Sequence, residues 1–248
     1  MVHIKGCGER WDRVGATTPG EWRTAANAVS RGSAVIASPG AQLEWLDEPC
    51  TLAVARETPG STLGIRIRAY TLVLLDADAQ LLKTLPLAGA TAGEVADWLA
   101  RQGFTPGHGR DFPPTPNQAV LGELDRTMSN VHEMLGYISR RTQGAGAVRS
   151  NPATLETCVK IRLSSREGES PRTIELGFTL DGDQGELFVR TEPGFGFQAL
   201  RLPISGIAAM SDVDAQAPAV ERFFQESLGE AYASLRRQWQ SRRPSAPV

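Results

Sequence analysis

The chain has 248 residues, of which 41% are hydrophobic and 22% charged, with a formal net charge of −2. These are ordinary globular values, so they exclude disordered, collagen-like and coiled-coil classes. The near balance of 26 basic and 28 acidic residues makes a nucleic-acid or membrane binder improbable, and 6% aromatic residues are few for a stacking platform.

Cysteine usage and hydropathy bear on the compartment. Cys7, Cys50 and Cys158 are widely separated, and no two have Cys-x-x-Cys spacing. An odd, sparse set is typical of a reducing cytoplasm and disfavours a zinc ribbon or a disulfide framework. No secretory-signal core follows the N-terminus, and the longest apolar run, residues 72–75, is far shorter than the ~20 residues of a membrane span. We expect a cytoplasmic protein without a membrane anchor.

The first half of the chain begins with a short helix and continues as strands. Pro19 opens a helical pattern that Gly32 is expected to end. Asp76 and Asp78 predict a hairpin tip, because short acidic side chains cap their own turns. The segments with strand character are 34–37, 42–46, 51–56, 63–69, 71–76 and 80–87.

Two helices and a linker occupy the middle of the chain. A helix is expected over residues 91–102, because Thr91 and Glu94 have the spacing of a capping box. Residues 106–117 are rich in proline and glycine and predict a linker. Apolar residues then recur at spacings of three and four, which predicts a long helix over residues 117–141.

The second half repeats the pattern of strands followed by a helix. Strands are expected over residues 155–164, 173–180, 186–191 and 197–203. A last helix is expected over residues 217–239, and residues 241–248 read as a basic, flexible tail.

The order of elements suggests an internal duplication. Both halves carry a Leu-Asp-x-Asp tip, at Leu75 and Leu180, and a Leu-Pro pair after a strand, at Leu85 and Leu202. We therefore expect an α+β fold of two similar α-β-β-β-β-α halves, residues 1–105 and 118–240, with antiparallel strands covered by helices. The halves are expected to share one sheet or a pseudo-two-fold interface.

The second half also carries a family resemblance. Its segments 187–191, 202–203 and 220–224, together with Ile174 and Leu180, resemble a bacterial family of unknown function. Members of that family have two similar helix–strands–helix halves. The resemblance implies this architecture and a bacterial cytoplasmic setting, and it implies no catalytic residue.

Motifs for common cofactors and metals are absent from the sequence. It has no Walker A pattern, no dinucleotide-binding Gly-x-Gly-x-x-Gly and no Gly-x-Ser-x-Gly elbow. The acidic run from Asp181 has Glu186 where a calcium loop requires glycine, so we interpret it as a hairpin turn. We expect no cofactor and no metal site.

Four residues are candidates for contact with a ligand or partner. His108, Arg110 and Asp111 lie in the long linker, and such loops often carry function. His132 shares one stripe of the long helix with Asp125 and Ser129. Side chains on a single helix point the same way, so we do not expect these three to form a working catalytic triad. We interpret this stripe as a solvated flank.

These observations favour a cytoplasmic protein that binds a small molecule or a protein partner without an evident catalytic motif, and a homodimer is compatible with them. One alternative is an enzyme that uses carboxylate and arginine groups in a cleft between the halves. The other is a nucleic-acid binder with a duplicated, saddle-like fold, against which the acidic balance counts.

Overall fold

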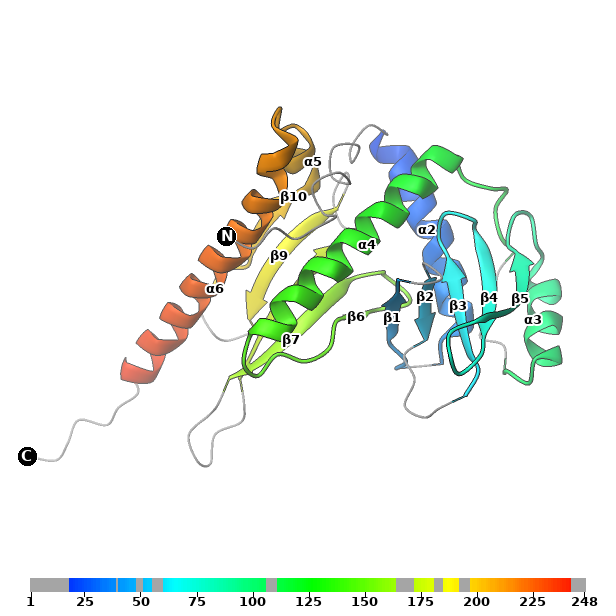
Figure 1. Ribbon diagram of the computed structural model, residues 1–248, viewed down its shortest axis with the longest axis horizontal. Coiled ribbons are helices and arrows are strands. Elements are labelled where there is room, and N and C mark those ends of the chain that lie inside the picture. The colour runs from blue at the N-terminus through cyan, green and yellow to red at the C-terminus, as the bar shows by residue number, and fades with distance from the viewer. Residues whose placement is uncertain are drawn as a thin grey trace, which may run out of the picture.

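The computed structural model describes residues 18–38, 40–47, 51–54, 60–105, 111–163, 172–180, 185–191 and 197–241. Within these ranges the protein is α+β, with a ten-stranded antiparallel sheet packed against helices (Figure 1). The expected fold class is confirmed, and the sheet runs through both halves of the chain. No described helix is long and apolar enough to cross a membrane.

The elements follow one another in two runs. The first comprises α2 (Pro19–Ile36), β1 (Leu43–Leu46), β2 (Thr51–Val54), β3 (Thr62–Arg66), β4 (Thr71–Leu75), β5 (Leu81–Pro86) and α3 (Ala92–Arg101). The second comprises α4 (Gln118–Arg141), β6 (Arg149–Ser150), β7 (Thr157–Leu163), β8 (Arg172–Thr179), β9 (Glu186–Thr191), β10 (Leu200–Pro203), α5 (Ile204–Ala208), the 3₁₀ turn Val213–Ala215 and α6 (Gln216–Ser241).

The strand order places the two halves on either side of a central junction. It is β10-β9-β8-β7-β6-β1-β2-β3-β4-β5, so each half is numbered outward from the contact between β1 and β6. Within the described residues that contact is narrow, because the register joins the two strands through Leu43 and Ser150 alone. The duplication of the halves stays a prediction, since strand order does not test a common origin.

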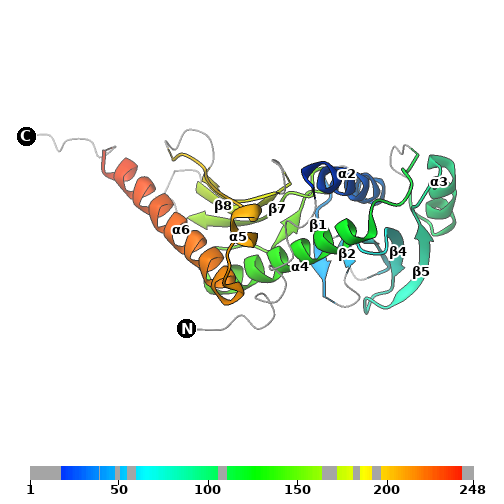
Figure 2. The same ribbon diagram turned by 90° about the horizontal axis from the view of Figure 1, so that it is seen from above.

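One apolar core unites the two halves. Buried side chains of α2, α4 and of strands from both halves form a single cluster, and α2 packs directly on α4. Figure 1 shows α4 crossing the strands of the C-terminal half diagonally, and Figure 2 shows α6 extending past that end of the sheet. The strand faces turned toward these helices supply the core. The opposite face of β7, β8 and β9 is open and charged.

The helix cap predicted from the sequence is present, because Thr91 and Glu94 form a reciprocal capping box at the start of α3. Two caps were not predicted. Thr18 with Glu21 forms a second capping box at the start of α2, and Asn117 caps α4 by accepting a hydrogen bond from the Ala119 backbone.

The end of α2 was predicted wrongly. The helix continues past Gly32 to Ile36, so the expected strand at residues 34–37 is mostly helical. A Cβ on Gly32 would lie 2.6 Å from Ile65 Cδ1 and 2.9 Å from Leu87 Cδ1. This glycine therefore allows the helix to lie close to the sheet and does not end it.

The number of strands also differs from the expectation. Within the described residues each half has five strands where the expected pattern of the halves had four, although five of the six segments predicted as strands in the first half are strands. The extra strand of the second half is β6, which has two residues and is too short to show an alternating pattern.

Candidate functional site

The four residues singled out in the sequence contact different parts of the molecule. His108 and Arg110 lie outside the described residues. Asp111 is exposed, and its Oδ1 accepts a hydrogen bond of 2.9 Å from the Ala92 backbone at the start of α3. Asp111 therefore acts as an additional cap of α3.

His132 is buried, so its interpretation as part of a solvated flank was wrong. The residue is 7% exposed, and its ring stacks on Trp45 of β1 with centroids 5.9 Å apart. Burial, together with the nearby charge of Arg149, lowers the pKa of His132 to about 3. The imidazole is therefore neutral at physiological pH, and it lies where β1 meets β6.

Ser150 and Thr157 continue a chain of hydrogen bonds from His132. Ser150 Oγ lies 2.9 Å from His132 Nε2 and 2.6 Å from Thr157 Oγ1, and Thr157 Oγ1 lies 3.2 Å from the Leu155 carbonyl oxygen. Ser150 and Thr157 are fully buried, so this chain of hydrogen bonds does not present Ser150 to a substrate. The contacts satisfy buried polar groups where α4 packs against β6 and β7.

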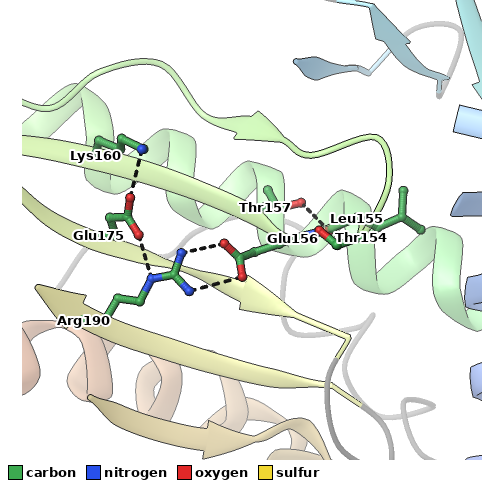
Figure 3. Close-up of polar contacts among 7 residues, drawn as sticks. All are labelled: Thr154, Leu155, Glu156, Thr157, Lys160, Glu175 and Arg190. Atoms are coloured by element: carbon green, nitrogen blue, oxygen red, sulfur yellow. Dashed lines mark hydrogen bonds and ion pairs between the residues drawn. The ribbon is translucent and has the colours of Figure 1, made fainter. Parts of the chain in front are cut away.

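Four charged side chains form a connected set of ion pairs on the face of β7, β8 and β9 that is turned away from α4. Figure 3 shows Lys160, Glu175, Arg190 and Glu156 in front of these strands, with α4 behind them. Glu175 accepts from Lys160 Nζ at 2.9 Å and from Arg190 Nε at 2.6 Å. Arg190 also binds both carboxylate oxygens of Glu156, at 2.6 and 3.2 Å. The network thereby ties the loop before β7 to β8 and β9.

An aromatic ring supports this network from below. The Arg190 guanidinium lies 4.5 Å from the centroid of the buried Phe188 ring. Phe188 is opposite Gly177 in the β8–β9 register. A Cβ on Gly177 would lie 2.7 Å from Phe188 Cζ, so glycine makes room for the ring and the ring holds the guanidinium.

A cavity of about 750 Å³ adjoins the network. It lies over the face shared by β7 and residues 144–149, which pair with β7 through backbone hydrogen bonds and lead into β6. Gly146 N donates to Lys160 O, and Arg162 N donates to Gly144 O, both at 2.9 Å. The lining residues are Gln42, Gly144, Ala145, Gly146, Ala147, Arg149, Cys158, Lys160, Arg162 and Thr173.

Among the described residues, the charged side chains that line the cavity are all cationic. Arg149 pairs with Glu44 at 2.9 Å, and Lys160 pairs with Glu175 at the same distance, but neither carboxylate lines the cavity. Arg162 is exposed and forms no ion pair with another described residue. The cavity therefore presents positive charge.

Cys158 gives the cavity a thiol without nucleophilic character. Burial, together with the charges of Glu175 and Glu156, raises the pKa of Cys158 to about 11. The thiolate, which is the reactive form, is therefore scarce near neutral pH. Among the described residues, no group of histidine, cysteine and carboxylate side chains is arranged to hold a metal ion.

The sequence contained part of the signal for this site. The alternation of β7 places Lys160 and Arg162 on one face of a strand, but it does not say which face is open or what lies beside it. The approach of residues 144–149 to β7 depends on backbone pairing over more than ten residues, which no local pattern reveals. Comparison of the chain with models of protein families, with curated proteins and with solved structures finds no match.

Proposed function

We propose that this protein binds a small molecule without transforming it, and that the ligand occupies the cavity over β7 and residues 144–149. The observation that carries the proposal is the cavity itself. Its volume of about 750 Å³ is in the range of small-molecule sites. Backbone hydrogen bonds fix residues 144–146 against β7, and the pair with Glu175 orients Lys160, so little order has to be created on binding.

Binding has more support than catalysis, which was the alternative. Burial alone would raise the pKa of Glu175, but hydrogen bonds from Lys160 and Arg190 outweigh it and lower that pKa. Glu175 thus stays ionised and engaged, which suits a structural role better than proton transfer. Cys158 stays protonated, and Ser150 and His132 are buried and do not line the cavity.

The proposal keeps the cytoplasmic, bacterial setting expected from the sequence. Its support is the sparse set of cysteines, together with the resemblance of the second half to a bacterial family. Cys158 is a free thiol.

Native mass spectrometry of gently purified protein tests the proposal. We expect an additional mass that leaves on denaturation and that is unchanged by prolonged incubation. Ala147 is exposed and lines the cavity, so Ala147→Trp fills the cavity without changing the charge. This variant should lose the additional mass.

Ala233→Trp is the matched control, because Ala233 is an exposed alanine on α6 and does not line the cavity. It should keep the additional mass. A mass retained equally by both variants would contradict the proposed site, and conversion of the bound molecule during incubation would favour the enzyme.

A further inference from the structure

The cationic side chains of the cavity follow one line. Arg149 is opposite Cys158 in the β6–β7 register, and Lys160 and Arg162 follow two and four residues further along the same face of β7. Same-face neighbours on a strand are about 7 Å apart, so the line extends over about 13 Å. None of the ten lining residues is acidic or aromatic.

We infer that the ligand is a small molecule with two or more anionic groups, either carboxylates or phosphates. This inference rests on the proposed function and adds the chemical class of the ligand. One anionic group would meet one or two of the cations, whereas a polyanion matches the whole line. The described part of the lining holds no aromatic ring, which argues for recognition by charge and against stacking of a nucleobase.

Arg162 is the anchor of this site. It has no ion pair with another described residue, so it can bind an anion without giving up a partner among those residues. Arg149 and Lys160 are held by Glu44 and Glu175, and both pairs are partly exposed. Exposed ion pairs contribute little net stability, so a ligand can share or replace these carboxylates at small cost.

Glu44 is therefore an internal competitor of the ligand. Its Oε2 lies 2.9 Å from Arg149 Nη1, on the neighbouring strand, and its carboxylate does not line the cavity. Replacing Glu44 by glutamine releases Arg149 and removes one negative charge beside the site. The inference thus predicts tighter binding of anions on removal of a residue that does not line the cavity.

Isothermal titration calorimetry at constant ionic strength tests the inference, with citrate and pyrophosphate as probes and acetate as the monoanion. We expect citrate or pyrophosphate to bind at least about tenfold more tightly than acetate. The tighter of the two probes identifies the anionic group. Arg162→Gln should weaken that probe about tenfold, and Glu44→Gln should strengthen it about threefold.

Arg201→Gln is the matched control, since Arg201 pairs with Glu186 and does not line the cavity. The affinity of this variant for the tighter probe should stay within about twofold of that of the unchanged protein. Equal losses of probe affinity in Arg162→Gln and Arg201→Gln would overturn the inference, because non-specific attraction of the anion to positive charge would then explain binding. A DNA oligonucleotide that bound more tightly than both probes, and depended on Arg162, would overturn it in favour of nucleic acid.

The two proposals fail in different ways. A neutral bound mass that Ala147→Trp removes would overturn the polyanion and leave the binding site in place. Insensitivity of the bound mass and of probe binding to Ala147→Trp would overturn both proposals.

Discussion

A neutral imidazole buried at the junction of the two halves makes the stability of the protein depend on pH. The pKa of His132 is lowered from 6.5 to about 3, so the folded chain stays unprotonated where the unfolded chain takes up a proton. Stability from this residue is complete above the unfolded pKa and is lost as the pH falls from 6.5 toward 3. His132 thus favours the folded state only when it is neutral.

We predict that the free energy of unfolding falls by about 2–3 kcal/mol between pH 7.5 and 4.5 because of His132. Urea denaturation at several pH values measures this slope. His132→Phe keeps an aromatic ring beside Trp45 and removes the titrating group. The variant should therefore be less stable at pH 7.5, but its free energy of unfolding should change less between pH 7.5 and 4.5. Equal slopes in the two proteins would contradict the assignment.

At the scale of residues, the sequence indicated which side chains to consider, but it did not indicate what surrounds them. His132 was singled out, but its partner Ser150 lies 18 residues away on another element, so the helix pattern alone assigned it to a solvated flank. Lys160 and Arg162 were correctly placed in an alternating strand. Their role as lining residues depends on Gly144 and Gly146, which approach β7 from the loop after α4.

At the scale of elements, the open face of the C-terminal half depends on one glycine. A Cβ on Gly177 would lie 2.4 Å from the Thr157 carbonyl oxygen, 2.7 Å from Phe188 and 2.9 Å from Cys158 Cβ. The first of these atoms belongs to the backbone of β7, so it cannot turn aside. Gly177 therefore fixes the distance between β7 and β8 and the position of the Phe188 ring.

We predict that Gly177→Ala lowers the free energy of unfolding by about 2–3 kcal/mol, because β7 and β8 must move apart. Gly229→Ala is the control: Gly229 is exposed on α6 with no atom near its Cβ position, so the variant should be more stable by about 1 kcal/mol. Urea denaturation measures both changes. Unchanged stability of Gly177→Ala would contradict the packing described for this face.

The elements that the sequence predicted well are those with a long repeating pattern. The helix predicted over residues 117–141 is α4, because apolar residues that repeat at helical spacing over six turns are compatible only with a helix. The end of α2 and the strand β6 were missed for different reasons. Gly32 is required by packing against Ile65, which is distant in sequence, and β6 is a strand only because β1 and β7 flank it.

At the scale of the whole molecule, α4 and the shared core make the two halves interdependent. The β1–β6 contact is narrow, yet buried residues of α2, α4 and the strands of both halves form one cluster. Neither half can expose its part of that cluster without removing contacts from the other. The expected linker at residues 106–117 therefore separates the halves along the chain, whereas the shared core joins them in packing.

We predict a single cooperative unfolding transition for the whole chain. Differential scanning calorimetry should give a calorimetric enthalpy close to the van't Hoff enthalpy. Two separate transitions, or a van't Hoff enthalpy well below the calorimetric value, would show that the halves unfold independently.

The central claim is that a ligand occupies the cavity over β7 and residues 144–149, and a crystal structure of the protein with the tighter calorimetric probe tests it most directly. The account predicts density for the anion within hydrogen-bond distance of Arg162, with Arg149 or Lys160 turned toward it. An empty cavity at saturating probe, or density bound only elsewhere on the molecule, would contradict it.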